Sequence, residues 1–116
     1  MEAADLAAAG ARFFAVIEGD RAIAMGALKR LSGGGGEVKS MHVRADRRGH
    51  GLADRMLGHL LAVAHGSGMA RVFLETGSQD AFRPARAFYA RHGFTLCPPF
   101  EGYAEDPNSV FMARDV

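Results

Sequence analysis

Apolar and polar positions in the first part of the chain follow the pattern of half-buried strands. Phe13–Ile17 is an apolar, β-prone run, the three residues after it are typical of a tight turn, and Ala22–Leu28 returns as the second arm of a hairpin. Four consecutive glycines, Gly33–Gly36, predict a flexible turn because glycine has no side chain to pack. Glu37–Val43 alternates its side chains and predicts a third strand.

The spacing of apolar residues changes to that of a helix in the middle of the chain. Apolar side chains recur there at the spacing of one helix face, and they are Leu52, Met56, Leu57, Leu60, Leu61 and Ala64. The run Gly66–Gly68 is typical of a helix end. Val72–Leu74 is short and continuously apolar, which suits a strand in the interior of a sheet.

The remaining segments complete an α/β arrangement. Pro84 suits the first turn of a helix that continues over Ala85–Arg91, and Phe94–Leu96 and Val110–Met112 predict the last two strands. The alanine-rich segment Asp5–Arg12 predicts a short helix at the start. The order is therefore hairpin, strand, helix, strand, helix, strand, strand, which indicates one α/β layer arrangement.

Composition limits the classes of protein that fit this pattern. A chain of 116 residues is too short for two ordinary domains, so we expect a single domain over residues 1–116. A net charge of +1 argues against broad binding to nucleic acid or anionic membranes. The acidic start differs from a signal peptide, and no apolar run approaches the ~20 residues of a membrane span. We therefore expect a cytoplasmic protein.

The junction between the third strand and the first long helix carries the clearest chemical motif. Arg47 and Arg48 precede two glycines, Gly49 and Gly51, at the point where the helix begins. Free backbone N–H groups and the positive end of the helix dipole form an anion site there, and arginines suit a pyrophosphate. A tight turn with solvated arginines explains the loop equally well when it is taken alone. The Walker motif and the dinucleotide fingerprint are excluded, since the chain lacks Gly-Lys-Ser/Thr here and has Asp54 in place of a third glycine.

Two motifs in this order resemble those of the GNAT N-acetyltransferase superfamily. Gly49 and Gly51 match its motif Gln/Arg-x-x-Gly-x-Gly/Ala, although Asp46 stands where Gln or Arg is usual. Ala85–Phe94 is similar to its second signature, Ala-x-x-Phe-Tyr-x-x-x-Gly-Phe. The resemblance extends over most of the chain. It implies a mixed, mostly antiparallel central sheet flanked by helices.

Two further segments look like those of a small bacterial subgroup of the superfamily, namely Leu74–Gly77 and Glu105–Met112. Two features depart from the family pattern. Phe82 stands where Asn is frequent, and the N-terminal helical region that helps to form the acceptor pocket is very short. We therefore expect that the chain is truncated or that a partner completes the pocket.

The resemblance implies acetyl-CoA as co-substrate and assigns residues to it. Backbone groups of the third strand would bind the pantetheine arm, and the N–H of Val43 would stabilise the thioester oxygen as an oxyanion hole does. His50 is expected to contact phosphate. The residues expected to hold the cofactor are Met41, His42, Val43, Arg48, Gly49, His50, Gly51, Leu52 and Ala53.

The resemblance also places Tyr89 where the family has its general acid. A phenol with an ordinary pKa of about 10 can protonate the departing thiolate, although a core tyrosine is the structural alternative. Glu37 is the first candidate for the base that deprotonates the amine and Glu75 the second, directly or through a water; both also fit ordinary polar strand positions. Cys97, the only cysteine, excludes an internal disulfide and more readily packs than acts as a nucleophile. We therefore favour direct attack within a ternary complex.

The other charged and polar residues receive weaker assignments. Arg83 and Arg86 are either solvated or reach the 3′-phosphate, and no metal is expected because no histidine pair has metal-ligand spacing with a carboxylate. His42 could face away from the site. The residues expected on the surface are His59, His65 and His92, and those expected along the acceptor side or in turns are Tyr103, Glu105, Asp106, Asn108 and Ser109.

The sequence thus predicts transfer of an acetyl group from acetyl-CoA to a primary amine of a small molecule or peptide. Two alternatives remain open: a non-catalytic acyl-CoA-binding module with the GNAT fold, and a phosphate-binding interaction domain that does not use CoA. No nucleic acid or membrane partner is expected. The exposed apolar arm Phe13–Ile17 predicts a symmetric homodimer.

Overall fold

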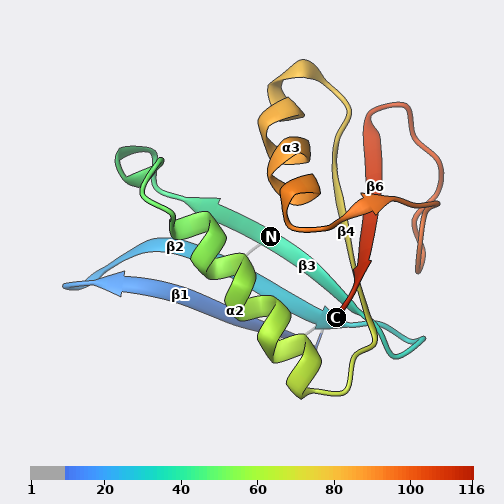
Figure 1. The fold of residues 1–116 in the computed structure, drawn as a ribbon, viewed down its shortest axis with the longest axis horizontal. Helices are drawn as coiled ribbons and strands as arrows, with labels where there is room; N and C mark the ends of the chain where they lie inside the picture. Colours follow the sequence, from blue (N-terminus) through green and yellow to red (C-terminus); the bar gives the residue numbers. More distant parts are fainter. Residues whose placement is uncertain (1–9) are drawn as a thin grey trace.

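One six-stranded sheet carries two α-helices on the same face (Figure 1). The computed structural model describes residues 10–116. Short 3₁₀ turns precede both helices, at Ala45–Arg47 and Asp80–Phe82. The elements are β1 (Ala11–Glu18), β2 (Arg21–Arg30), β3 (Gly36–Val43), α2 (Leu52–Gly66), β4 (Arg71–Gly77), α3 (Arg83–Arg91), β5 (Thr95–Leu96) and β6 (Ser109–Asp115).

The strand order in the sheet is β1-β2-β3-β4-β6-β5, and every neighbouring pair is antiparallel except β3 and β4. This confirms the mixed, mostly antiparallel sheet. The parallel pair is very short, because only Gly36 with Val72 and Glu37 with Phe73 are in register. Beyond Glu37 the two strands diverge, as Figure 1 shows for the upper part of the sheet.

The order of elements agrees with the sequence prediction, and the strands are longer than predicted at β4 and β6. The predicted helix Asp5–Arg12 is wrong where the structure describes it. Ala11 and Arg12 belong to β1, where they pair with Lys29 and Leu28, because cross-strand pairing and the burial of Ala11 override the helix propensity of alanine. Residues 5–9 of that prediction lie outside the described residues.

The core forms between α2 and the sheet. Leu57, Leu60 and Ala64 lie on one face of α2 and are fully buried, as their helical spacing predicts. The sheet meets this face with alternate residues such as Leu28 and Val38. The other buried members of the cluster are Met56, Met69, Val72, Leu74, Phe94 and Met112. No helix within residues 10–116 is long and apolar enough to cross a membrane.

The edge strand β1 presents apolar side chains on both faces. Phe14 and Val16 pack against the main core, whereas Phe13 is 36% exposed and Ile17 is 60% exposed. Such exposed apolar side chains fit an interface, and the homodimer stays a prediction.

Burial on α2 predicts a difference in stability between two leucine variants. Leu57→Ala should lower the free energy of unfolding by about 2–5 kcal/mol, because Leu57 is 0% exposed and its loss leaves a cavity. Leu96→Ala is the matched control, since Leu96 is 75% exposed and should change stability by about 0.5 kcal/mol or less. Urea denaturation at constant m-value measures both. Similar losses in the two variants would contradict this position of the core.

Candidate functional site

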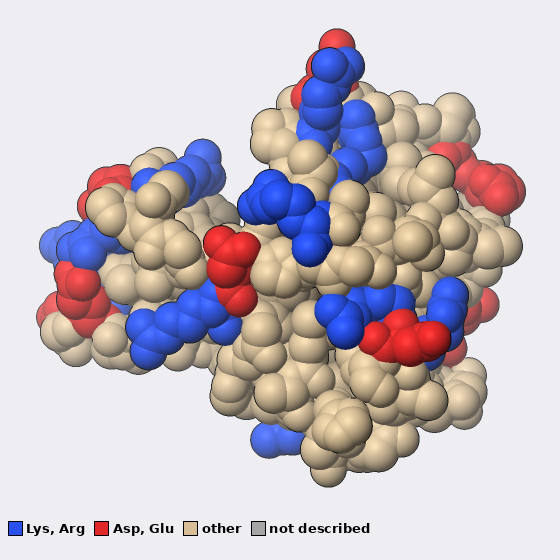
Figure 2. All heavy atoms as spheres, in the orientation of Figure 1, with Lys and Arg blue, Asp and Glu red and all other residues tan. Residues whose placement is uncertain are grey.

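A cavity of about 610 Å³ opens where β3 leads into α2, and α3 forms its opposite wall. Figure 2 shows a hollow here, with Lys and Arg side chains on both of its sides. Eight of the nine residues predicted to bind the cofactor line this cavity, together with the predicted acid Tyr89. The exception is His50, which is exposed in the loop and does not line it. The lining residues are Met41, His42, Val43, Arg47, Arg48, Gly49, Gly51, Leu52, Ala53, Asp54, Ala81, Pro84, Ala85, Phe88, Tyr89 and Arg91.

Backbone geometry explains why glycines stand between β3 and α2. Gly49 has φ +82° and Gly51 has φ +77°, a left-handed conformation that other residues rarely adopt. A Cβ atom at either position would meet no protein atom within 4 Å, so both glycines face open space. Gly51 is the N-cap of α2 and has no side chain to satisfy the first N–H groups. These donors and the positive helix end can therefore bind an anion.

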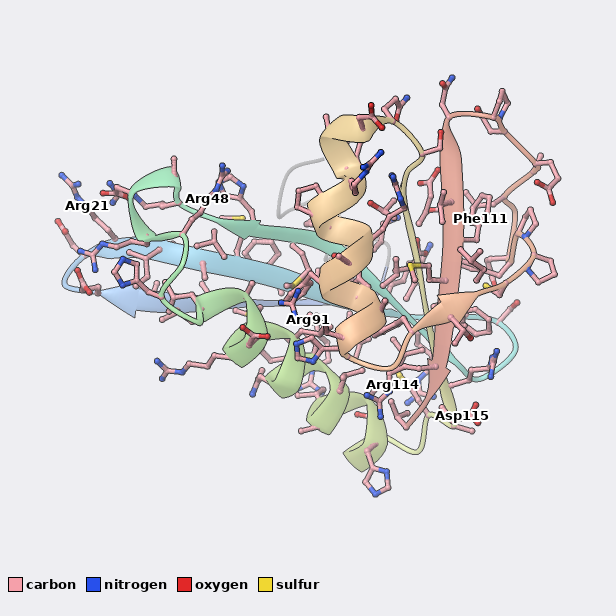
Figure 3. The ribbon with its side chains drawn as sticks, turned by 45° about the horizontal axis from the view of Figure 1, so that its top comes forward. Arg21, Arg48, Arg91, Phe111, Arg114 and Asp115 are labelled. Carbon is pink, nitrogen blue, oxygen red and sulfur yellow. The ribbon has the colours of Figure 1, made fainter. Side chains whose placement is uncertain are left out.

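Three arginines line the cavity, but one of them, Arg47, is already paired with a carboxylate of the protein. Arg47 makes a two-pronged ion pair with Glu18 of β1, and the hydrogen bond and charge of Glu18 raise the pKa of Arg47 above its ordinary value. Arg48 and Arg91 have no ion-pair partner within residues 10–116. They project from the loop after β3 and from the last turn of α3 (Figure 3). An anion in the cavity could thus be met by arginine from both walls.

Arg91 is a residue that the sequence reasoning missed. It stands at one of the unspecified positions of the second signature, so the motif itself gave it no role. Its guanidinium lies 5.6 Å from the ring centre of Phe88, which also lines the cavity. The only available signal was the basic charge near the helix end.

Hydrogen bonds hold α3 in place against the end of β4 and against α2. At its first half, Arg86 donates from Nη1 to the carbonyl oxygens of Gly77 at 2.6 Å and Gln79 at 3.0 Å. At its end, the ring nitrogen Nε2 of His92 lies 2.7 Å from Oδ1 of Asp54 in the first turn of α2. Arg86 therefore fixes the loop before α3, and the expectation that it is solvated is wrong. Contact of Arg86 with the 3′-phosphate stays a prediction. His92 joins the two helices at the mouth of the cavity, contrary to the prediction of a surface histidine.

Tyr89 lies on the face of α3 that packs on the core. Its ring contacts Phe94 edge-on at a centroid distance of 5.8 Å, and its side chain also lines the cavity. Burial raises the pKa of Tyr89 above its ordinary value, since the charged phenolate is disfavoured away from water. The phenol is thus kept protonated and can act as a proton donor.

Glu37 lies on the other face of the sheet. Its neighbour Val38 packs into the core beneath α2, so alternation turns Glu37 away from the helices. The residue is only 3% exposed, and the hydroxyl of Tyr103 donates a hydrogen bond of 2.7 Å to Oε2 of Glu37. The pKa of Tyr103 is raised by burial, by this hydrogen bond, and by the charges of Glu37 and Glu75.

Glu75, the second candidate for the base, shares this face but differs in exposure. It stands on β4 two residues after Phe73, the register partner of Glu37. Glu75 is exposed and accepts a hydrogen bond of 2.6 Å from Oγ of Ser109. The structure therefore brings both candidate bases to one face and the candidate acid to the other.

Two remaining candidates, Cys97 and Arg83, do not line the cavity. Cys97 is half-buried, and burial raises the pKa of its thiol, which disfavours a nucleophilic thiolate. Arg83 is exposed and pairs with Asp80 at 3.0 Å. Within residues 10–116 no group of three or more His, Cys, Asp or Glu side chains is placed to hold a metal ion.

Both tyrosines of the chain have raised pKa values, which gives a titration test without mutation. Phenolate absorbance of the native protein should rise at a higher pH than that of the protein in urea, where both phenols should ionise near pH ~10. The folded state then holds protons that the unfolded state releases, so stability should fall as pH rises above ~10. A native titration centred on the ordinary tyrosine pKa would contradict the burial of both phenols.

Comparison with known proteins agrees with this geometry. Residues 2–94 match the model of the Acetyltransferase (GNAT) family. The uncharacterised N-acetyltransferase YsnE of Bacillus subtilis is 45% identical over 102 residues, which cover 88% of this chain and 68% of YsnE. A crystal structure described as an acyl-CoA N-acyltransferase of Klebsiella pneumoniae has a TM-score of 0.83 at 30% identity, covering 91% of this chain and 72% of that protein.

A third relative shares the fold at lower identity. It is described as a streptothricin acetyltransferase of Bacillus anthracis, solved in complex with acetyl coenzyme A, and has a TM-score of 0.77 at 18% identity, covering 92% of this chain and 63% of that protein. This chain thus spans 63–72% of the length of the three proteins. Because the family match extends over most of its length, the chain belongs to the GNAT family of acetyltransferases.

Proposed function

We propose that the chain binds acetyl-CoA in the cavity between β3, α2 and α3 and transfers the acetyl group to a primary amine by direct attack. The observation that carries this proposal is the divergence of β3 and β4 beyond Glu37. It leaves an opening in the sheet between the face with the cavity and the face with Glu37 and Glu75. A thioester held from one face can thereby meet an amine that arrives from the other.

The residues of the cavity fit the parts of acetyl-CoA. N–H groups at Gly51 and in the first turn of α2, with Arg48 and Arg91 beside them, suit the pyrophosphate. Backbone groups at Met41–Val43 lie beyond the last pair that β3 makes with β4, so they are not used by that strand. They can hydrogen-bond an extended pantetheine arm as a neighbouring strand would. The N–H of Val43 is proposed to stabilise the thioester oxygen.

The reaction then needs two protons removed from the ammonium and one proton given to the thiolate. Glu37 accepts the first proton from the ammonium through a bridging water, since the residue is only 3% exposed. The neutral amine then attacks the thioester carbon, so that the C–N bond forms and the C–S bond breaks, and the nitrogen releases its second proton to solvent, from which Tyr89 is reprotonated. Tyr89 donates its proton to the departing sulfur, which burial allows because it keeps the phenol protonated.

One observation favours a second function, a non-catalytic acyl-CoA-binding module. Tyr103 covers Glu37 in this structure, so the candidate base is not directly accessible to an amine. Such a module would use the same cavity without transferring the acetyl group.

Mass spectrometry distinguishes the two functions. The protein is incubated with acetyl-CoA and a panel of primary amines, and a mass gain on an amine, dependent on the protein, is expected for the enzyme. Isothermal titration with CoA and with ATP tests the cavity itself, since a general phosphate site would bind both. Binding of CoA without any acetylated amine would favour the module.

A glycine variant tests the proposed pyrophosphate site. Gly51→Val places a branched side chain where the phosphates approach the backbone, and should weaken acetyl-CoA binding about tenfold or more, or about 1.4 kcal/mol. Gly19→Val is the matched control, because Gly19 has φ +64° and also faces open space but lies in the β1–β2 turn. Equal affinity in a folded Gly51→Val protein would remove this loop from the site.

A phenylalanine variant tests the acid. Tyr89→Phe keeps the ring and its packing and removes only the hydroxyl, so kcat should fall about 10²-fold. The Kd for acetyl-CoA should stay unchanged, because the proton is needed only after the amine attacks. Turnover at the parent rate on a good acceptor would show that Tyr89 is not the acid.

A further inference from the structure

Glu37 is the one buried charged side chain within residues 10–116. A buried carboxylate resists ionisation unless hydrogen bonds or charges compensate for the lost water. A carboxylate must be ionised to accept a proton. Whether Glu37 can act as the base therefore depends on the groups that surround it. The side-chain donor that the structure places on it is the phenol of Tyr103, at 2.7 Å from Oε2.

Tyr103 is held in place independently of this hydrogen bond. Its backbone N–H bonds the carbonyl of Phe100 at 3.0 Å, and its ring lies 5.1 Å from the ring of Phe100 and 5.5 Å from that of Phe111 on β6. Phe100 in turn lies 4.9 Å from Phe73, the register partner of Glu37 on β4. The loop between β5 and β6 is thus packed onto the sheet at the point where β3 and β4 part.

We infer that Tyr103 is a positioning residue for the base: its hydroxyl fixes Oε2 of Glu37 and keeps the carboxylate ionised, so that Oε1 is left to accept the proton of the acceptor amine. This inference rests on the proposed function, in which Glu37 is the base. Tyr103 does not exchange a proton with the substrate in this scheme. Its raised pKa keeps the phenol protonated and therefore keeps it a donor at neutral pH.

Other charges face Glu37 and contribute to the same balance. Lys29 is its register partner on β2, and Lys39 is two residues further on the same face of β3. Both ammonium groups favour an ionised carboxylate. Glu75 on β4 opposes it, although Glu75 is exposed and hydrogen-bonded to Ser109. Within residues 10–116, Tyr103 alone makes a side-chain hydrogen bond to the carboxylate of Glu37.

The test is the pH profile of Tyr103→Phe, which keeps the ring cluster and deletes the donor. Loss of the donor disfavours the ionised carboxylate, so the acid limb of kcat/KM for the amine should move up by about one pH unit, which lowers kcat/KM about tenfold on that limb and little on the plateau above it. The KM for acetyl-CoA should not change. In a Glu37→Gln background, Tyr103→Phe should cause no further shift, because Tyr103 acts through Glu37.

Phe100→Leu is the control for a merely structural role. It disturbs the ring cluster but retains the phenol, and it should leave the acid limb in place. An acid limb that does not move in Tyr103→Phe, or that moves equally in Phe100→Leu, would overturn the inference.

A second readout separates this inference from the proposed function. The carboxyl carbon resonance of Glu37 in the CoA-bound protein, assigned by its loss in Glu37→Gln, should titrate at higher pH in Tyr103→Phe whether or not an amine is acetylated. A protein that acetylates no amine would refute the proposed function alone. If the resonance titrates at the same pH in Tyr103→Phe as in the parent protein, the proposed role of Tyr103 is refuted, even in an active enzyme.

Discussion

The short parallel pairing of β3 with β4 is the constraint on which the rest of the site depends. Two register pairs hold the sheet together at Glu37, and beyond them each strand follows its own antiparallel neighbour, β2 or β6. A longer pairing would close the sheet and separate its two faces. Because the pairing stops, the backbone of Met41–Val43 is unpaired on the side of β4, and these three residues line the cavity on the helix side.

The helices convert this opening into a binding site with defined charge. α2 begins where β3 ends, so its positive N-terminal end points to the cavity, and the left-handed glycines make that abrupt junction possible. α3 must be held far enough from α2 to leave room for the cavity between the two helices. Arg86 fixes it to the end of β4, and His92 ties it to Asp54 of α2. Polar contacts at the helix ends thus set the width of a cavity whose floor is apolar core.

Much of this could be predicted from the sequence, because local patterns determine it. The apolar spacing of α2, the glycines before it and the Phe-Tyr signature of α3 each depend on neighbouring residues, and each identified its element correctly. The helix predicted across Ala11 and Arg12 was wrong because strand pairing with β2 is not a local property. For the same reason no role could be assigned to Arg91 from the sequence, since the position of α3 against the glycine loop depends on the tertiary fold.

The surroundings of Glu37 also could not be predicted from local sequence. Its residue type and strand position suggested a base, but the alternation of the strand could not reveal that a loop more than sixty residues later would cover it. The fold surrounds the two candidate proton-transfer groups differently: burial raises the pKa of Tyr89 and keeps it a neutral phenol on the helix side, whereas Tyr103 donates a hydrogen bond to Glu37 on the other side. Burial disfavours the charged form of either group, and Glu37, the more buried of the two, is the one that receives a hydrogen bond. In our proposal this donor is what allows one side of the sheet to hold an acid and the other a base.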